Sequence, residues 1–295
     1  MQIQSLSIVV PTEKCVNDCA FCVSKQHSED YGQNRMAFNN PEIHKAIEDY
    51  KKRLAYARDN NCNAVMLTGD AEPTQNRAFL TLFGLLNESL SKPFRHISIQ
   101  TAGAFLDQNY IEFLRDHVGV NTVSLSISSF SHVINRNYTG AKERINISKL
   151  CEMIKSSGLN LRISLNMTDQ ILPGQSQPKP EKIFQHVKHV LNADQITFRV
   201  LYSDQSNPDC PQNQWIKEHA ATPEYIESIK NYIREHGRPL EILAFGQTRY
   251  DVDGISTVLD DDCMSTQAKA ELKYLVLRPN CKLYTKWDST ASLLF

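Results

Sequence analysis

The amino-acid sequence predicts an α/β fold with a parallel sheet, followed by a β-rich C-terminal extension. Short runs rich in β-branched residues alternate with longer amphipathic segments, six times in succession. Such alternation is typical of parallel strands joined by right-handed helical crossovers. The strand segments are mostly apolar, which indicates that both faces of the sheet are covered. After Gly237 the rhythm changes to short strands separated by turn residues such as Asp253-Gly254.

The first part of the chain supplies the strand–helix units. We expect their strands at residues 6–10, 64–68, 96–100, 122–127, 161–166 and 195–201. We expect their helices at residues 41–59, 76–90, 107–117, 142–157, 180–192 and 223–236. The turn-rich segments 170–180 and 203–215 are predicted to be long loops near the active end of the sheet. The extension is expected to contain strands at residues 240–245, 255–259, 274–278 and 282–287.

Composition and charge argue against several classes of partner. The formal net charge is -1, so no global field attracts nucleic acid or an anionic membrane. No window approaches the roughly 20 apolar residues that a transmembrane helix needs. The first six residues lack the basic and apolar stretches of a signal peptide. We therefore predict a cytoplasmic protein whose cysteines are ligands or nucleophiles, with no membrane or nucleic-acid partner.

Three of the eight cysteines lie within eight residues. Cys15, Cys19 and Cys22 follow the predicted strand 6–10, and their spacing allows three thiolates to converge on one centre. Thiolates are the usual ligands of iron–sulfur clusters. Because a cubane cluster has four irons, three cysteines leave one iron open. An open iron is a site for chemistry, as an open coordination position is in catalytic metal sites.

A zinc site is the alternative interpretation of this motif. Structural zinc usually has four ligands, and His27, five residues after Cys22, can serve as the fourth. A bacterial-type ferredoxin would show a regular two-residue spacing and a fourth cysteine before a proline. The sequence has neither of these ferredoxin features.

The other five cysteines are scattered. Cys62 and Cys151 fall at a strand start and in a helix, where we expect them to be buried small hydrophobic residues. Two interpretations stay open for Cys210, Cys263 and Cys281. In the first, these cysteines bind a second iron–sulfur cluster. In the second, they bind no cluster, and Cys281 occupies a turn position.

The cysteine motif resembles that of the radical S-adenosylmethionine (radical SAM) superfamily. The cysteines are spaced three and then two residues apart, and the aromatic Phe21 stands just before the last. The resemblance covers residues 5–202 and implies a partial (β/α)6 barrel, open on one side. We place this barrel at residues 1–237 and a β-rich extension covering its opening at residues 238–295. The implied cofactors are a [4Fe-4S] cluster on Cys15, Cys19 and Cys22, and SAM.

The segment after the second strand is similar to the family's segment that holds the amino group of SAM. Here it contains Gly69, Asp70 and Glu72. The commoner family forms carry Gly-Glu where this chain has Asp70-Ala71, so either Asp70 or Glu72 is the expected contact. A glycine lets the backbone approach the ligand, and a carboxylate accepts hydrogen bonds from an ammonium group.

Later strands carry further matches to the family. Ser124, Ser126 and Ser128 alternate on strand four, so they share one face. The resemblance implies that Ser126 and Asn166 reach the ribose and carboxylate of SAM. It also implies that the backbone around Val200 meets the adenine, and Phe21 packs beside the cluster or the adenine. Ligands bind at the carboxyl ends of parallel strands, and all of these residues are expected to lie at that edge of the sheet.

The resemblance implies reductive cleavage of SAM to a 5′-deoxyadenosyl radical, which abstracts hydrogen from a substrate. Residues 126–130 and 137–140 resemble the same stretch in viperin and in the GTP cyclase of molybdenum-cofactor biosynthesis, which favours a small, nucleotide-like substrate. Arg249 can bind a phosphate or carboxylate, or be a surface residue of a hairpin. A peptide- or protein-modifying enzyme is the alternative, and an iron–sulfur sensor or inactive barrel is the non-enzyme alternative. A one-electron reductant such as flavodoxin or ferredoxin is the expected partner.

Overall fold

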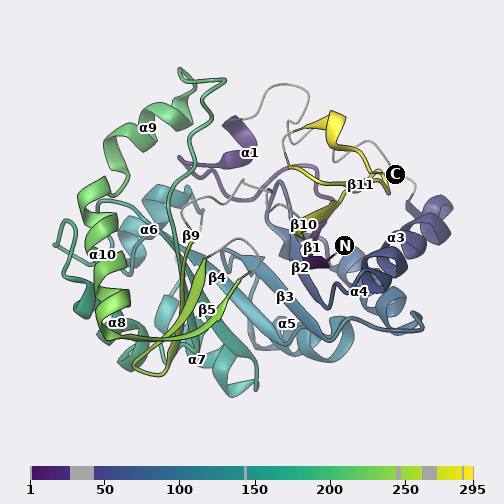
Figure 1. Ribbon diagram of the computed structural model, residues 1–295, viewed down its shortest axis with the longest axis horizontal. Coiled ribbons are helices and arrows are strands. Elements are labelled where there is room, and N and C mark those ends of the chain that lie inside the picture. Colours follow the sequence, from purple (N-terminus) through teal and green to yellow (C-terminus); the bar gives the residue numbers. More distant parts are fainter. Residues whose placement is uncertain are drawn as a thin grey trace.

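A computed structural model of the chain describes residues 2–26, 43–142, 145–243, 247–260, 271–287 and 289–294. Within these residues, one sheet has the strand order β11-β10-β1-β2-β3-β4-β5-β6-β9-β8-β7. The neighbours from β10 through β1–β6 to β9 are all parallel, and only the outermost pairings are antiparallel. The chain therefore forms an α/β fold with a mostly parallel sheet, as the sequence predicts (Figure 1).

The strands of the first part lie close to their predicted positions. They are β1 (Gln2–Val9), β2 (Ala64–Thr68), β3 (His96–Thr101), β4 (Thr122–Ile127), β5 (Asn160–Asn166) and β6 (Gln195–Arg199). The helical segments here are α1 (Val23–Gln26), η1 (Ile43–Ala46), α3 (Ile47–Asp59), η2 (Pro73–Gln75), α4 (Arg77–Glu88), α5 (Gln108–Phe113), η3 (Leu114–Val118), α6 (His132–Thr139), α7 (Ile147–Ser156), α8 (Pro180–His189), α9 (Pro211–His219) and α10 (Pro223–His236). The predicted helix 41–59 begins outside the described residues.

Two helices differ from the prediction. Segment 203–215 is not a loop throughout, because α9 begins at Pro211, a residue suited to the first helical turn. Helix α6 falls in a stretch for which no helix is predicted. Its start is capped by the Ser131 side chain and its end by Gly140 in the left-handed conformation. These local capping signals are present in the sequence, but both helices are too short for a clear apolar period.

The strands alternate between an apolar outer face and a polar inner face. On β5, Leu161, Ile163 and Leu165 belong to the hydrophobic core, whereas Arg162 and Asn166 hydrogen-bond to polar residues of neighbouring strands. The prediction that the strands are mostly apolar, without alternation, is therefore wrong for this strand. The helices cover the outer face, and the inner face lines the interior of an open barrel, where polar groups can meet a ligand.

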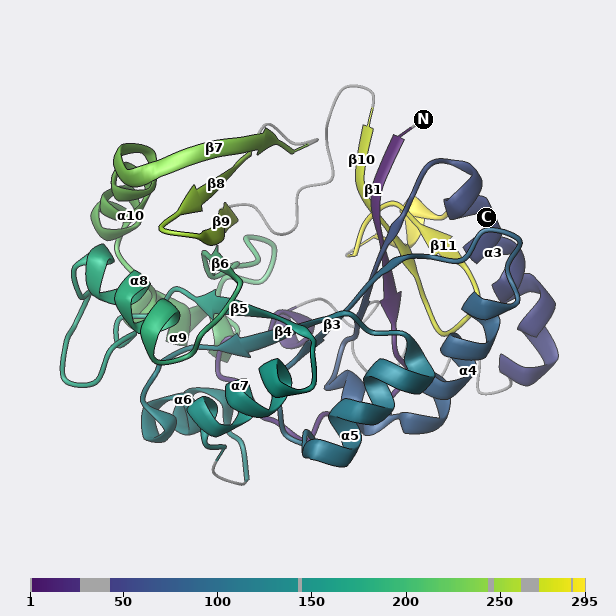
Figure 2. The same ribbon diagram turned by 90° about the horizontal axis from the view of Figure 1, so that it is seen from below.

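The strands after α10 join both edges of this sheet. They are β7 (Gly237–Ile242), β8 (Thr248–Val252), β9 (Ile255–Asp260), β10 (Glu271–Leu277) and β11 (Leu283–Tyr284), followed by η4 (Thr290–Ser292). Strand β9 pairs with β6 and β10 pairs with β1, so the two ends of the sheet stand opposite each other (Figure 2). The boundary at residue 237 and the covering of the opening stay predictions.

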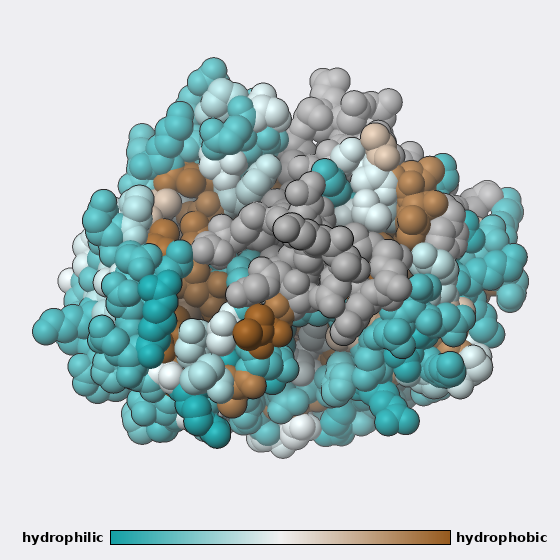
Figure 3. All heavy atoms as spheres, in the orientation of Figure 1, coloured by the Kyte–Doolittle hydropathy of each residue, from teal (hydrophilic) through white to brown (hydrophobic). Residues whose placement is uncertain are grey.

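The helices turn polar faces outward. Helix α10 buries Tyr225, Ile229 and Ile233 on one side. On the face shown in Figure 3, the surface over α8 and α10 is mostly hydrophilic, with hydrophobic residues gathered inward of it. None of the described helices is long and apolar enough to cross a membrane.

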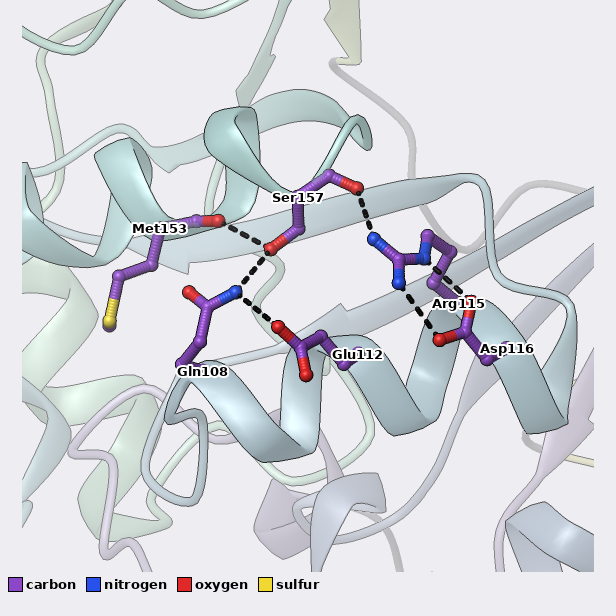
Figure 4. A network of polar contacts seen from close by, with 6 residues as sticks. All are labelled: Gln108, Glu112, Arg115, Asp116, Met153 and Ser157. Atoms are coloured by element: carbon purple, nitrogen blue, oxygen red, sulfur yellow. Dashed lines mark hydrogen bonds and ion pairs between the residues drawn. The ribbon is translucent and has the colours of Figure 1, made fainter.

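Polar contacts also join neighbouring helices on the outer side. The end of α7 is tied to α5 and η3, because Arg115 donates to the Ser157 carbonyl oxygen at 3.0 Å and Gln108 donates to the Ser157 hydroxyl at 3.1 Å (Figure 4). Cys62 and Cys151 are fully buried, as predicted for small hydrophobic residues.

Candidate active site

A cavity of about 440 Å³ opens where strands β1 to β6 end. We call this end of the barrel the mouth. All ten residues that the sequence singles out for cluster or SAM binding line the cavity: Cys15, Cys19, Cys22, Phe21, Gly69, Asp70, Glu72, Ser126, Asn166 and Val200. They come from loops and strand ends that lie far apart in the sequence. The carboxyl ends of parallel strands meet at one edge of the sheet, which brings these residues together.

The cysteine loop packs on the end of α6. The backbone N–H of Asp18 donates to the Thr139 carbonyl oxygen, and that of Ala20 to the Tyr138 carbonyl oxygen, both at 3.0 Å. Gly140, with φ of 59°, allows this close approach, because a Cβ there would lie 2.6 Å from the Asp18 carbonyl oxygen. The loop is therefore held in one conformation by a neighbouring element.

Two glutamine side chains hold the loop from other sides. Gln75, in η2, accepts a hydrogen bond from the backbone N–H of Val16 at 2.7 Å. Gln26 is fully buried, donates to the Tyr202 carbonyl oxygen at 3.0 Å and accepts from the N–H of Asp204 at 2.9 Å. The loop is thus fixed to the segments that follow β2 and β6. Such fixation preorganises a ligand set on a loop.

The three thiols on this loop influence one another. Burial is the main cause that raises the pKa of Cys15, Cys19 and Cys22, and at Cys19 the charges of the other two thiolates add to the rise. A bound metal would reverse this preference, because a coordinating thiol is deprotonated. No three His, Cys, Asp or Glu side chains among the described residues are close enough to hold one metal ion. A cubane does not need such closeness, since each cysteine binds a different iron.

Glu72 is a structural hub at the mouth. Its side chain is 4% exposed and accepts four hydrogen bonds. Oε1 accepts from the Thr74 N–H at 3.2 Å and from the hydroxyls of Thr74 and Thr101, each at 2.6 Å, and Oε2 accepts from the Ala102 N–H at 2.8 Å. These bonds tie the end of β2 to the end of β3. Both carboxylate oxygens are therefore engaged within the protein.

Asp70 is held by a residue of the C-terminal part. Arg278, at the end of β10 and 1% exposed, donates to Asp70 Oδ2 at 2.6 Å. The same guanidinium donates to the Trp287 carbonyl oxygen at 2.8 Å and lies over the Trp287 ring at 5.3 Å from its centroid. Both acidic candidates for the SAM amino group are thus positioned by protein partners. Gly69 lies close to the residue that follows β1, because a Cβ there would be 3.2 Å from the Val10 carbonyl oxygen.

The predicted serine and asparagine on β4 and β5 contact each other. Asn166 Nδ2 donates to the hydroxyls of Ser126 at 3.3 Å and Ser128 at 3.1 Å. The N–H of Val200 donates to the Asp260 carbonyl oxygen at 3.1 Å, so its backbone donor is used by the neighbouring strand. Phe21 packs against Trp215 of α9, with ring centroids 5.6 Å apart, and also lines the cavity.

A polar network crosses the barrel next to these residues, since Arg199 stands opposite Asn166. Arg199 Nε donates to the Ser164 hydroxyl at 2.7 Å, and its other nitrogens donate to Asp260 at 3.2 Å and Gln100 at 3.4 Å. Gln100 in turn donates to the Ser164 hydroxyl at 3.1 Å. The network connects β3, β5, β6 and β9. Three of its members, Gln100, Arg199 and Asp260, line the cavity.

Sequence reasoning missed several residues that build the site. Arg278 is 208 residues from Asp70 in the chain, and no local pattern indicates their ion pair. Arg199 and Asp260 alternate with apolar residues on their strands. The prediction of mostly apolar strands without alternation overlooked this signal. His27 and Cys263 lie outside the described residues, so the zinc and second-cluster alternatives that use them stay predictions. Cys281 is buried in a turn with φ of 59°.

Comparisons with known proteins identify the family. The model of the radical SAM superfamily matches residues 9–187, more than half of the chain. The chain therefore belongs to the radical SAM superfamily and is a radical SAM enzyme, with a [4Fe-4S] cluster and SAM as its cofactors. The narrower resemblance to viperin and the GTP cyclase stays a prediction. No curated protein matches the sequence.

Solved structures share the fold. Native anSMEcpe with bound AdoMet, which is SAM, has a TM-score of 0.59 and 12% identity, over 97% of this chain and 76% of that one. Coproporphyrinogen III oxidase (HemN) from Escherichia coli, a radical SAM enzyme, has a TM-score of 0.51 and 15% identity, over 80% of this chain and 54% of that one. Methylornithine synthase (PylB) has a TM-score of 0.51 and 14% identity, over 79% of this chain and 63% of that one. This chain thus covers less than two thirds of the last two proteins.

Proposed function

We propose that Cys15, Cys19 and Cys22 bind the [4Fe-4S] cluster, and that SAM occupies the mouth beside them. The observation that carries this proposal is the single cavity shared by the three thiols, the segment 69–72, Ser126 and Asn166. Three thiolates suit a cubane with one open iron, to which the amine and carboxylate of SAM can bind. When bound, the cluster supplies one electron that cleaves SAM to methionine and a 5′-deoxyadenosyl radical.

The residues of the mouth position SAM and exclude water in this proposal. Glu72 fixes the ends of β2 and β3, and the carbonyl groups of segment 69–71 accept from the SAM ammonium group. Asn166 and Ser126 hydrogen-bond the ribose or the carboxylate, and Phe21 covers the cluster side. Preorganised polar groups of this kind orient a cofactor without reorganising during the reaction.

The proposed reaction is abstraction of a hydrogen atom from a small, nucleotide-like substrate by the 5′-deoxyadenosyl radical. The barrel interior below the mouth is polar and includes Arg199, Gln100 and Asp260, which suits a small polar molecule. A one-electron reductant such as flavodoxin or ferredoxin supplies the electron.

A peptide substrate is the second candidate. Strand β7 is the last strand of the sheet among the described residues, and its Leu240 and Ile242 side chains are exposed. An exposed edge strand of this kind can pair with an extended peptide. If a peptide substrate binds by pairing with β7, a peptide pool should raise 5′-deoxyadenosine formation by the wild-type protein. Leu240→Lys and Ile242→Lys should lower this increase, because they alter the edge to which the peptide binds.

Electron paramagnetic resonance of the reduced cluster tests the proposal. Protein reconstituted anaerobically with iron and sulfide, and then reduced, is measured with and without SAM. We expect SAM to change the spectrum, because it binds the open iron. A spectrum of a cubane that SAM leaves unchanged would contradict the proposal and favour the sensor or inactive barrel. Absence of any cluster in the wild-type protein would contradict the cysteine assignment.

A further inference from the structure

The interior of the barrel holds three arginines, one of which belongs to the polar network, and the described residues include few carboxylates that pair with them. Arg162 on β5, Arg199 on β6 and Arg249 on β8 lie close enough that the charges of Arg199 and Arg249 act on Arg162. Arg199 pairs with Asp260, and Arg249 Nη2 lies 3.3 Å from Glu241 Oε1. Among the described carboxylates, none pairs with Arg162. Its hydrogen bond is donated from Nε to Gln195 Oε1 at 2.8 Å.

Register places a buried, unpartnered hydroxyl next to Arg162. On the inner face, Ser124 of β4 stands opposite Arg162 of β5, and Arg162 stands opposite Gln195 of β6. The Ser124 side chain is fully buried, and its Oγ has no hydrogen-bond partner within the described structure. A buried hydroxyl without a partner costs free energy, so a native structure that keeps one needs a reason such as a ligand.

Arg249 supplies a second unsatisfied donor to the same region. Its neighbour Tyr250 packs against the hydrophobic core outside the sheet, so alternation along β8 turns Arg249 to the inner face. Its Nε is buried and has no partner among the described residues. We call Ser124, Arg162, Gln195 and Arg249 the floor of the barrel. The pKa of Arg162 is lowered to about 10, mainly by burial and also by the charges of Arg199 and Arg249.

We infer that the floor is the binding subsite for an anionic oxygen group of the substrate, a phosphate or a carboxylate. A guanidinium presents paired N–H donors that match both groups, and the Ser124 hydroxyl can add a third hydrogen bond. An anion would also neutralise the charge that Arg162 carries without a carboxylate partner. This inference rests on the proposed function, because it names the substrate class of the same barrel.

Strand geometry sets the shape of this substrate. Arg162 lies four residues before Asn166 on β5, about 13 Å along the strand at ~3.3 Å per residue. The long Arg162 side chain can reach toward the mouth, so its guanidinium can lie closer to Asn166 than the backbone distance. The substrate is therefore a small elongated molecule. Its anionic group lies at the floor, and the C–H bond that loses its hydrogen lies at the mouth.

Binding of simple anions to the protein without cofactors tests the inference independently of activity. Isothermal titration calorimetry is done with inorganic phosphate in one arm and succinate in the other, at low ionic strength. We expect at least one of them to bind the wild-type protein. Arg162→Gln should weaken that binding about tenfold or more, since it removes a charge-assisted hydrogen-bond donor. The arm that binds more tightly distinguishes phosphate from carboxylate.

Further variants keep the test valid if Arg162→Gln fails to fold. Ser124→Ala removes only the orphaned hydroxyl and should weaken binding severalfold, and Arg162→Lys should retain part of it. Arg238→Gln is the control, because Arg238 is 75% exposed and already paired with Asp251. Equal binding by the wild type, Arg162→Gln and Ser124→Ala would overturn the inference.

The inference and the proposed function can fail separately. Wild-type protein that forms 5′-deoxyadenosine from SAM but binds neither anion would overturn the inference alone. Protein that binds phosphate or succinate through Arg162, but whose reduced cluster SAM leaves unchanged, would overturn the proposed function and keep the anion subsite.

Discussion

The mouth and the floor of the same barrel differ in how their polar groups are satisfied. At the mouth, Glu72 accepts four hydrogen bonds and Asp70 is paired with a buried arginine. At the floor, the Ser124 hydroxyl and Arg249 Nε have no partner among the described residues, and Arg162 has no paired carboxylate there. Buried polar groups are normally satisfied, so the two regions have different requirements.

The difference matches two kinds of ligand. The carboxylates of the mouth are held by hydrogen bonds within the protein, which suits cofactors that must be held in one geometry for each turnover. The floor keeps hydrogen-bond capacity in reserve, which suits a substrate that enters and leaves. The polar network of Gln100, Ser164, Arg199 and Asp260 joins the two regions, because Arg199 stands opposite Asn166 of the mouth and Gln100 opposite Ser124 of the floor. Substitutions at each level should therefore have different consequences.

The largest effect is expected from Cys19→Ala. Removing one of three thiolates should prevent assembly of the cluster and reduce 5′-deoxyadenosine formation to background, because a cubane is held by its thiolates. Iron and sulfide content, absorbance and 5′-deoxyadenosine are measured after anaerobic reconstitution. Cys62→Ala is the control, since Cys62 is buried in the core and should leave iron content unchanged. Normal SAM cleavage by Cys19→Ala would contradict the site.

Arg278→Gln should destabilise the protein by about 3–5 kcal/mol, because it leaves the Asp70 carboxylate without its buried guanidinium partner. The free energy of unfolding is measured with urea, and the Kd of SAM with the folded fraction. Arg238→Gln removes an exposed ion pair and should change the free energy by about 0.5 kcal/mol or less. Equal effects of the two variants would mean that the Asp70–Arg278 pair does not organise the mouth.

Glu72→Gln should lower the free energy of unfolding by about 2–4 kcal/mol. The amide NH₂ cannot accept from the Ala102 N–H, so two donors would face each other in a buried position. SAM binding should weaken as well, because the ends of β2 and β3 separate. Glu112→Gln on α5 is the matched control, since Glu112 contacts only an exposed glutamine side chain in Figure 4. We would abandon the hub role of Glu72 if both variants unfolded at the same urea concentration.

At the floor, Arg162→Met should increase the free energy of unfolding by about 1 kcal/mol or more, since a buried charge without a paired carboxylate is costly. Folding lowers the pKa of Arg162 to about 10, so the cost is fully present below pH 10. As the pH rises through 10, the folded protein loses this proton and the gain from Arg162→Met shrinks.

Arg199→Met provides the contrast within the same barrel. It removes the guanidinium that pairs with Asp260, so it should destabilise the protein by about 3 kcal/mol. Urea unfolding of both variants at pH 7 and pH 9 makes the comparison. We expect the free energy of unfolding to rise in Arg162→Met and to fall in Arg199→Met. A fall of the same size in both variants would contradict the distinction between the floor and the polar network.

Much of the fold and many residues of the mouth could be predicted from the sequence, because the patterns that indicate them are local. The strands at 64–68 and 122–127 have the predicted bounds, and residues 223–236 form the predicted helix. The cysteine spacing and the segment 69–72 needed only the rule that parallel strands end at one edge. Their binding roles stay predictions.

Long-range contacts were not accessible in this way. The Asp70–Arg278 pair depends on β10 pairing with β1, two strands that lie at opposite ends of the chain. The floor depends on register across β4, β5 and β6, since a shift of one residue would turn Arg162 to the outer face. The sequence indicates Arg249 as a candidate anion ligand, but its location on the same side of the sheet as Arg162 depends on the pairing of β9 with β6 and β8.

The most direct test of the account is 5′-deoxyadenosine formation by the reconstituted enzyme with fractionated small molecules. An extract is separated on an anion exchanger, and the retained and unretained fractions are each incubated anaerobically with enzyme, SAM and dithionite. We expect 5′-deoxyadenosine to rise with the retained, anionic fraction and not with the unretained one. No 5′-deoxyadenosine in any tube, with a cluster verified by absorbance, would contradict it.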